Sequence, residues 1–322
     1  AMAMSSLGVP AVSLNAAQVV MHTSSAYGSA KLKRIDAERI RHELESRRIV
    51  IVTGFQGINK YDDFTTLGRG GSDTTAVALA AALHADVCEI YTDVEGVYTA
   101  DPRVVPNARK LAEVSYDEML EFASLGAKVL HNRSVEMAKK YGVKLVVLSS
   151  LTRAEGTIVK EETKVERTLI SGVAADASVA RISVLGVENK PGITFRVFNL
   201  LAKNHINVDI IIQSVTEPGK KDISFTVAKT DLSDTMDLLR ENRESLTARE
   251  IVSEEGVAKL SVIGAGMCSN PGVAAKMFEA LYSADVNTEM IATSEIRITA
   301  LIDERDVKRA MRAVHDAFDL AD

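Results

Sequence analysis

The feature that most constrains the fold is a repeat in the second half of the chain. The stretch ARISVLG at residues 180–186 returns as AKLSVIG at residues 258–264, an offset of 78 residues. A Pro-Gly pair and a nine-residue apolar stretch (INVDIIIQS, then VNTEMIATS) recur with an offset of 80 residues. Each copy is predicted to run strand, Pro-Gly turn, amphipathic helix, strand, strand, helix, which is the order of a ferredoxin-like α/β module.

The two copies differ in how they end. The first can finish with a fourth strand near residues 248–253, whereas the second ends at a helix over residues 305–318 with only four residues after it. The apolar segment TLISGVAA at residues 168–175 precedes the first copy and has no partner of its own. We predict that it supplies the missing strand, so that the first module is an insertion within the second. Separating the two modules would then expose a sheet edge.

The first half of the chain alternates helices with apolar strands. Strands are predicted at residues 48–53, 87–92 and 143–148, and an Ala-rich helix is predicted over residues 72–83. Such alternation predicts a mostly parallel sheet that helices cover on both faces. The polar segment at residues 152–166 has no sustained period, and we place the domain boundary there.

Composition excludes several classes of protein. The chain has 322 residues and a net charge of −6, without a basic block that could neutralise a run of phosphates, which disfavours a nucleic-acid binder. Its longest purely apolar stretch, residues 76–83, is too short for a membrane span, and no signal peptide opens the chain, so a cytoplasmic protein is expected. Cys88 and Cys268 lack zinc-site or disulfide spacing and are expected to be buried thiols.

Residues 65–75 (TTLGRGGSDTT) join a loop to the predicted helix over residues 72–83. Glycines let backbone N–H groups approach an anion closely, and a helix start adds partial positive charge. Arg69 can hold a carboxylate or phosphate with two hydrogen bonds. Asp73 has two open interpretations, since a carboxylate in this place either caps the helix or serves catalysis by organising a cation beside the anions. The spacing differs from a Walker motif, so the loop alone predicts only an anion site.

A second polar stretch, residues 92–103 (TDVEGVYTADPR), follows a predicted strand at the end where open α/β sheets bind ligands. Its Asp, Thr, Tyr and Arg side chains can face a nucleotide, and the alternative is a polar loop with an Asp-Pro turn. Lys128 stands at the predicted start of a further helix, where a cation is unusual unless an anion binds beside it.

With these residues the chain resembles the aspartokinases, within the wider amino-acid-kinase family. The matching strings are VTGFQG at residues 52–57, TTLGRGGSD at 65–73, TDVEGVYTADPR at 92–103, GAKVLH at 126–131 and TSEIRI at 293–298. The resemblance covers nearly the whole chain and implies a three-layer amino-acid-kinase fold followed by two ferredoxin-like ACT modules. The expected division is residues 1–160 for the kinase part, 161–179 for a linker and the donated strand, 180–254 for the first ACT module and 255–322 for the second.

The resemblance implies ATP-dependent phosphorylation of L-aspartate to 4-phospho-L-aspartate with Mg²⁺, which opens the route to lysine, threonine and methionine. By the same resemblance Asp73 is the catalytic aspartate, and Arg69 and Ser72 contact the substrate. The implied ATP site consists of Thr92, Asp93, Tyr98, Arg103 and Lys128. Phosphoryl transfer depends mainly on positioning and on neutralising charge, which Arg69 and Lys128 can supply.

Two departures from the family pattern bear on activity. His131-Asn132-Arg133 stands where the family shows His-Pro-Arg, so a looser turn is expected there, with Arg133 retained. The family's opening Lys-Phe-Gly-Gly strand and a later Gly-Glu pair do not occur in these residues. We therefore expect this chain, as given, to be an inactive fragment of the kinase domain with an exposed apolar sheet edge. The alternative is a non-catalytic subunit that senses amino acids.

The ACT resemblance implies feedback inhibition by lysine, threonine or both. Candidates for the effector site in the first copy are Thr194, Asn207, Asp209 and Gln213, near a helix start that suits a carboxylate. Asp209 has two open interpretations: it meets an ammonium group of the effector, or it faces solvent in an alternating strand. In the second copy Glu289 stands in place of Asp209, so that copy is expected to serve mainly in pairing, and side-by-side ACT modules predict a homo-oligomer.

His84 and His315 have no carboxylates or histidines around them at ligand spacing. They are predicted to be helix-surface or hydrogen-bonded core histidines rather than metal ligands, and no metal-ligating residue is assigned in the chain.

Overall fold

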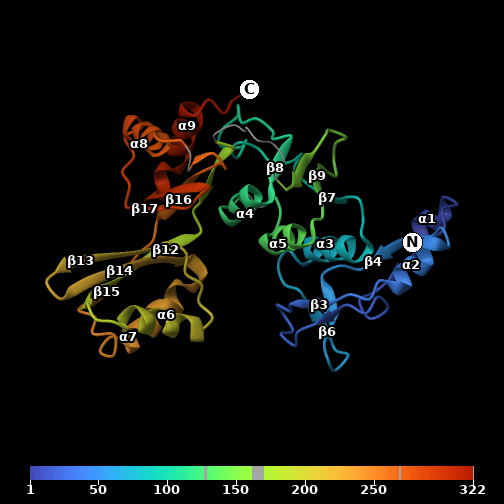
Figure 1. Ribbon diagram of the computed structural model, residues 1–322, viewed down its shortest axis with the longest axis horizontal. Helices are drawn as coiled ribbons and strands as arrows, with labels where there is room; N and C mark the ends of the chain where they lie inside the picture. The colour runs from blue at the N-terminus through green and yellow to red at the C-terminus, as the bar shows by residue number, and fades with distance from the viewer. Residues whose placement is uncertain (127–128, 162–169, 268–269, 322) are drawn as a thin grey trace. The chain divides into compact units, whose positions relative to one another are not determined.

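The computed structural model describes residues 1–126, 129–161, 170–267 and 270–321 (Figure 1). The chain divides into two compact units. Unit 1 comprises Ala1–Tyr98 and Lys110–Glu166, and unit 2 comprises Thr99–Arg109 and Arg167–Asp322. No helix in the described ranges is both long enough and apolar enough to cross a membrane.

The described residues of unit 1 form three sheets and five helices. The sheets are β1–β4 (Ala11–Leu14, Ile49–Val52), β7–β9–β10–β8 (Cys88–Thr92, Leu145–Ser149, Thr157–Lys160, Glu113–Ser115) and β3–β2–β5–β6 (Leu32–Arg34, His22–Thr23, Gln56–Ile58, Phe64–Thr66). The helices are α1 (Met2–Ser6), α2 (Glu38–Glu45), α3 (Gly71–Leu83), α4 (Tyr116–Ser124) and α5 (Asn132–Tyr141). The α/β fold class predicted from the sequence is confirmed.

Local chemistry explains how the helices of unit 1 begin, end and pack. Helix α4 starts with a capping box, in which Ser115 and Glu118 satisfy each other's backbone N–H groups. Helix α5 ends at Gly142 in the left-handed conformation, which glycine adopts without strain. The Ala-rich α3 buries Val77, Ala78 and Ala80, because small side chains let a helix approach its neighbours closely.

Three details of unit 1 differ from the sequence expectations. The pairs β1–β4, β7–β9 and β8–β10 are parallel, but β9 and β10 are antiparallel. Strand β10 lies inside the polar segment, residues 152–166, where the sequence predicts the domain boundary and no strand. Strand β4 was expected to be buried, yet Ile49 is 43% and Ile51 36% exposed.

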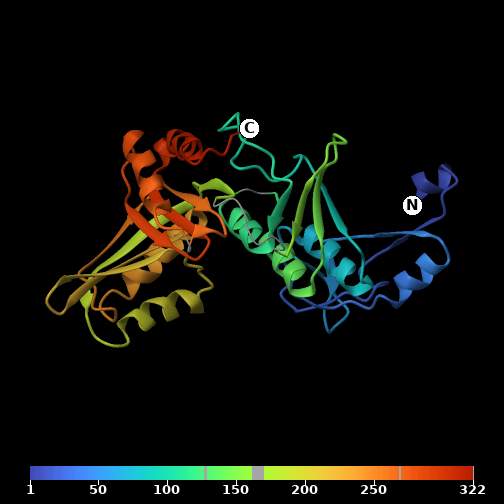
Figure 2. The same cartoon turned by 45° about the horizontal axis from the view of Figure 1, so that its top comes forward.

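Unit 2 contains two four-stranded antiparallel sheets (Figure 2). The first has the order β13–β14–β12–β15 (Ile211–Glu217, Lys220–Ala228, Val179–Glu188, Glu250–Glu254), and the second β11–β16–β18–β17 (Gly172–Asp176, Val257–Ile263, Arg297–Asp303, Met290–Thr293). The first is covered by α6 (Ile193–Lys203) and α7 (Leu232–Glu241), and the second by α8 (Val273–Ser283) and α9 (Val307–Ala317). Both sheets have the ferredoxin-like order.

Strand β11 joins the second sheet by pairing antiparallel with β16. The first module therefore lies, in the sequence, between two neighbouring strands of the second. Its core includes Ile182, Val197 and Phe225, and a smaller apolar cluster that includes Ile210 and Leu301 joins the two modules. Burying these side chains removes apolar surface from water, which is the main favourable term in folding.

Candidate functional site

The glycine-rich loop of unit 1 runs from β6 into α3. Gly68 has φ +77° and Gly70 has φ +69°, a left-handed conformation that favours glycine. Gly70 is the N-cap of α3, and no side chain caps that helix. The Gly71 amide donates to the Gly68 carbonyl (3.0 Å), so the backbone N–H groups of Ser72 and Asp73 are the ones directed out of the helix without a capping side chain, which suits an anion.

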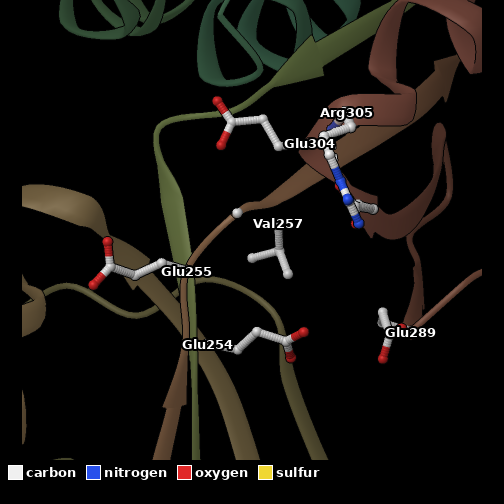
Figure 3. A pocket seen from close by; sticks show the side chains of 8 residues that line it. Glu254, Glu255, Val257, Glu289, Glu304 and Arg305 are labelled. Carbon is white, nitrogen blue, oxygen red and sulfur yellow. Dashed lines mark hydrogen bonds and ion pairs between the residues drawn. The ribbon is translucent and has the colours of Figure 1, made fainter.

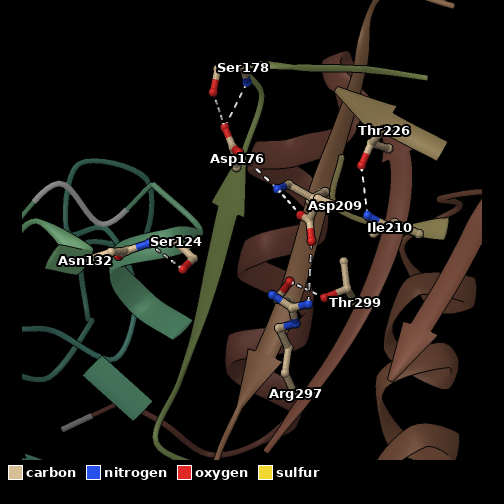
Figure 4. Close-up of polar contacts among 11 residues, drawn as sticks. Ser124, Asn132, Asp176, Ser178, Asp209, Ile210, Thr226, Arg297 and Thr299 are labelled. Atoms are coloured by element: carbon tan, nitrogen blue, oxygen red, sulfur yellow. Dashed lines mark hydrogen bonds and ion pairs between the residues drawn. The ribbon is translucent and has the colours of Figure 1, made fainter. Parts of the chain in front are cut away.

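Arg133 in the first turn of α5 and His131, the N-cap residue of that helix, lie against this loop. Arg133 donates from Nη1 to the carbonyl oxygen of Leu67 (2.6 Å) and from Nη2 to that of Ala30 (3.0 Å). A Cβ atom on Gly70 would lie 2.2 Å from Cγ of His131, so only glycine fits beside that ring. The retained arginine of the His-Asn-Arg sequence thus fixes the loop, and Asn132 donates to Ser124 Oγ (2.8 Å, Figure 4).

Asp73 lies in the first turn of α3, where a negative charge is favourable, but it does not cap the helix. Ser72 Oγ donates to Asp73 Oδ1 (3.3 Å), and this is the one hydrogen bond of the Asp73 side chain within the described ranges. Arg69 and Ser72 are exposed and Asp73 is half-buried. Arg69 and Ser72, predicted to contact the substrate, and Asp73, the predicted catalytic residue, therefore lie close together around the start of α3, and all three reach solvent.

Asp73 also acts on a neighbouring thiol. Burial, together with the negative charges of Asp73 and Glu89, raises the pKa of Cys88 to about 11. The Cys88 thiol is therefore protonated at neutral pH, as a buried structural cysteine should be. Cys268 lies outside the described residues.

The candidates for the ATP site fall in two places. Thr92 ends β7, and its Oγ1 donates to Asp93 Oδ1 (3.0 Å). Tyr98 belongs to unit 1, and burial raises its pKa above the usual value, with Glu95 adding to the effect. Arg103 belongs to unit 2, where its exposed guanidinium is paired with Asp101 (2.8 Å). Lys128 lies outside the described residues.

Two of the four effector candidates, Thr194 and Gln213, are hydrogen-bonded to each other. Thr194, in the first turn of α6, donates from Oγ1 to Gln213 Oε1 (3.0 Å). Lys221, on β14, donates to Thr194 Oγ1 (2.9 Å) although its side chain is only 5% exposed. Asn207 is exposed.

Asp209 makes a different contact (Figure 4). It accepts a hydrogen bond from Lys259 Nζ (2.7 Å) on β16 of the second module, and Lys259 also pairs with Asp176 (3.3 Å). Burial raises the pKa of Asp176, but hydrogen bonds from Ser178 and the charge of Lys259 outweigh it, so the pKa is below its usual value. Asp209 thus pairs with a buried ammonium of the chain itself.

An acidic cavity of about 470 Å³ opens beside the β15–β16 turn (Figure 3). Its carboxylates include Glu254 and Glu289, which both pair with Arg181, and Glu304, which pairs with Lys229 (2.7 Å). Basic side chains thus already neutralise these three carboxylates of the cavity. Among the described residues, no group of three His, Cys, Asp or Glu side chains is placed to hold a metal ion.

Two residues that make buried polar contacts in unit 2 were not assigned to any site from the sequence. Lys221 shares the alternation of Ile223 and Phe225, so the period of two already places it on the covered face of the sheet. His315 was expected to be a surface or core histidine, and it is buried, with a hydrogen bond to Thr99 (2.9 Å). No local pattern predicts that contact, because 216 residues separate the partners. His84 is exposed at the end of α3.

Three stretches of the chain match known protein families. Residues 1–149 match the amino acid kinase family, and residues 180–244 and 260–318 each match the ACT domain. An aspartokinase of Bacillus sp. (strain MGA3) is 49% identical over 322 residues, which is 100% of this chain and 78% of the relative. An aspartokinase of Corynebacterium glutamicum is 48% identical over 326 residues, covering 99% of this chain and 77% of the relative.

Two solved structures of E. coli aspartokinase III are similar over nearly the whole chain. The complex with aspartate and ADP (R-state) has a TM-score of 0.83 at 32% identity, and it covers 98% of this chain and 71% of that one. The complex with lysine and aspartate (T-state) has a TM-score of 0.76 at 31% identity with the same coverage.

Proposed function

The chain belongs to the aspartokinase family, and from this we propose that it transfers the terminal phosphoryl group of ATP to the side-chain carboxylate of L-aspartate. A carboxylate oxygen attacks the γ-phosphorus, the bond to the β,γ-bridging oxygen breaks, and ADP leaves beside 4-phospho-L-aspartate. The aspartate and ADP held by the E. coli relative support this pair of substrates.

The observation that carries the proposal is the fixed glycine loop of unit 1. Arg133 and the His131 ring hold the loop, and the uncapped start of α3 directs backbone N–H groups toward an anion. Catalysis of phosphoryl transfer rests on positioning and on donors that meet developing negative charge. A rigid loop meets this requirement without reorganising during the reaction.

Each exposed residue of the loop has a proposed role. Arg69 binds a carboxylate of aspartate or a phosphate oxygen, since a guanidinium can donate two parallel hydrogen bonds. Ser72 donates a hydrogen bond to the substrate or to Asp73. Asp73 is the proposed catalytic residue, whose second carboxylate oxygen remains available to orient the reacting groups. Thr92, Asp93, Tyr98, Arg103 and Lys128 are proposed to bind ATP.

Magnesium would neutralise charge on the phosphates in such a reaction. Mg²⁺ keeps several waters and needs one or two carboxylates besides the substrate phosphates. The lone carboxylates of Asp73 and Asp93 fit this requirement, whereas the described residues contain no metal cage. We therefore propose that the metal arrives with the nucleotide.

We also propose that lysine, threonine or both inhibit the enzyme through the ACT modules. The lysine bound to the E. coli relative supports this regulation. In the first module, Thr194, Gln213 and the ammonium of Lys221 form a polar group at the start of α6, which suits the carboxylate of an amino acid. Asn207 and Asp209 remain further candidates, and Asp209 would have to leave Lys259 to meet an effector ammonium.

A homo-oligomer formed through the ACT modules is proposed as the assembly. Strands β13 and β17 are the last strands of their sheets, and they expose Ile211 (49%), Val215 (65%) and Ile291 (45%). An edge strand with exposed apolar side chains is a template for pairing with another chain. A cytoplasmic location remains the expectation from the sequence.

Enzyme assay of an extended chain tests the proposed reaction. In this chain the opening segment of the Bacillus relative is joined ahead of Ala1, and formation of aspartyl phosphate is measured by trapping it with hydroxylamine. We expect Asp73→Asn to lower kcat roughly a hundredfold and Arg69→Ala to raise KM for aspartate roughly tenfold. Asp86→Asn, at an exposed position outside the loop, is the matched control.

The same assay on the 322 residues as given tests the expected inactivity. Turnover by that chain would overturn the expectation, and turnover by the extended chain with unchanged Asp73→Asn would overturn the role of Asp73. If neither chain turns over while calorimetry shows lysine or threonine binding, the non-catalytic sensor is the correct function.

A further inference from the structure

One segment of the chain packs in a different unit from the residues on either side of it in the sequence. Thr99–Arg109 packs in unit 2, whereas Tyr98 and Lys110, on either side of it, belong to unit 1. Within unit 1, Tyr98 and Lys110 form an antiparallel bridge. Within unit 2, the Thr99 amide donates to the carbonyl of Arg109 (2.8 Å). The segment therefore leaves unit 1 and returns to it through neighbouring residues.

Strand β11, helix α9 and the residues after α9 contact this segment at several points along its length. The amide of Val173 on β11 donates to the carbonyl of Thr99 (2.7 Å). Arg312 on α9 donates from Nε to the carbonyl of Val104 (2.8 Å), and Ala108 bridges Ala321. The buried residues of the segment are Thr99, Ala100, Val105 and Ala108.

The Thr99 hydroxyl is the most connected group of the segment. Its Oγ1 lies 2.9 Å from His315 Nε2 and 3.2 Å from the carbonyl oxygen of Leu320, and it accepts from the Arg109 amide (2.9 Å). Thr99 and His315 are both 0% exposed. Removing one partner from such a buried group costs more than the hydrogen bond itself contributes.

These partners determine the tautomer of His315. The hydroxyl has one proton, which the Leu320 carbonyl can accept only if Thr99 does not also donate to the imidazole. His315 Nδ1 has no hydrogen-bond partner within the described ranges, and Asp316 Oδ1 lies 3.8 Å from it. A bare lone pair is less costly to bury than an unpaired N–H group. We therefore assign the proton to Nε2, so that His315 donates to Thr99 and Thr99 donates to Leu320.

We propose that His315 is a positioning residue for nucleotide binding, acting through Thr99 on the segment Thr99–Arg109. The proposal rests on the proposed function, because it takes Arg103 as part of the ATP site. Arg103 lies within the segment, so fixing Thr99 helps to fix the backbone that carries its side chain. Bidentate pairing with Asp101 further orients the Arg103 guanidinium.

The test measures KM and kcat for ATP in the extended chain, with calorimetric ADP binding as a second readout. Thr99→Val keeps the shape of the side chain and removes the hydroxyl, and His315→Leu removes the donor. Both variants should raise KM for ATP and Kd for ADP roughly tenfold, with kcat within about twofold of the parent. Thr99→Ser and His315→Gln, which retain the hydroxyl and an Nε2–H donor, should restore the parent values.

A matched control separates positioning from general destabilisation. Val314 is 0% exposed on the same helix and makes no hydrogen bond through its side chain, so Val314→Ala weakens unit 2 while leaving Thr99 paired. Unchanged KM in Thr99→Val, or an equal rise in Val314→Ala, would overturn the positioning role alone. Absence of any nucleotide binding by the parent would overturn the proposed function, and this inference with it.

Discussion

Gly70 and Gly142 have almost the same backbone conformation but different surroundings. Their φ angles are +69° and +66°, and both sit at helix ends. A Cβ on Gly70 would lie 2.2 Å from His131 Cγ, whereas nothing lies within 4 Å of a Cβ on Gly142. Gly142→Ala should therefore cost about 1 kcal/mol, the strain of a left-handed alanine. Gly70→Ala should cost about 3 kcal/mol, because the His131 ring must also move.

Urea unfolding of the two variants measures this difference in the free energy of unfolding. Gly142→Ala serves as the control, since it carries the same backbone strain without the collision. Equal losses in the two variants would show that the loop yields easily at Gly70, and that His131 does not fix it.

His315 gives unit 2 a predictable dependence on pH. Burial lowers the pKa of His315 below the usual 6.5, although the nearby Asp316 charge opposes the shift. Below pH 6.5 the unfolded chain therefore binds more protons than the folded one, so the free energy of unfolding falls as the pH falls from 6.5 toward the pKa of the folded state. The stabilising effect of the neutral ring is complete above pH 6.5. Thermal unfolding at pH 7.5 and 5.5 should show this loss in the parent chain.

His315→Gln is the reference for this measurement, because glutamine does not titrate in that range. A drop in melting temperature between pH 7.5 and 5.5 that is as large in His315→Gln as in the parent would assign the loss to other groups.

The roles of individual residues were harder to predict from the sequence than the kind of site that they form. The glycine-rich string indicated an anion site, because glycine, arginine and a helix start serve few other purposes together. The sequence left open whether Asp73 caps α3, since a shift of a single residue in the start of the helix decides whether Asp73 can be the capping residue. The structure begins α3 at Gly71, after Gly70, which leaves Asp73 free of capping.

At the scale of elements, the Lys259 ammonium links its strand to two other segments through two ion pairs. It lies on β16, is 5% exposed, and pairs with Asp176 and with Asp209 of the first module. Lys259→Met would leave Asp176 buried without its cation, and we expect a loss of about 3 kcal/mol in the free energy of unfolding. Asp209→Asn should cost about 1 kcal/mol or less, because Asp209 is 43% exposed and Lys259 keeps Asp176.

Chemical unfolding of both variants at neutral pH compares the two costs. If Asp209→Asn proves as damaging as Lys259→Met, then Asp209 and not Asp176 is the main partner of the ammonium. Effector binding that engages Asp209 would then weaken the link between the modules.

Elements with a strong period were predicted well, and short ones inside polar stretches were missed. The predicted helix over residues 72–83 differs from α3 by one residue, because its alanines leave few alternatives. Strand β10 was missed because its four residues lie among charged ones. Its place in the sheet comes from neighbours far along the chain, including a pair between Lys160 and Glu113 (2.8 Å).

At the scale of the whole molecule, the path of the chain predicts how its parts open. The amides of Thr99 and Arg109 are bonded within unit 2, whereas those of Val97 and Leu111 are bonded within unit 1. Native-state hydrogen exchange in low denaturant should therefore divide these four amides into two pairs. Each pair should exchange with the opening free energy of its own unit.

Mass spectrometry of short overlapping peptides across residues 95–112 resolves the two pairs. Distant amides of each unit, such as those of α3 and α9, supply the reference values. A single exchange rate for all four amides would mean that the segment opens locally, without regard to either unit.

The insertion of the first ACT module has a consequence for protein engineering. The module departs after Asp176 on β11 and returns before Val257 on β16, and these strands are hydrogen-bonded neighbours, with Asp176 opposite Lys259. Its two attachment points thus lie side by side, so the intervening stretch can be exchanged as a cassette between relatives while the second sheet stays whole. A transplanted cassette must bring its own equivalents of the residues that join it to its host, among them Asp209, Ile210, Arg181 and Lys229.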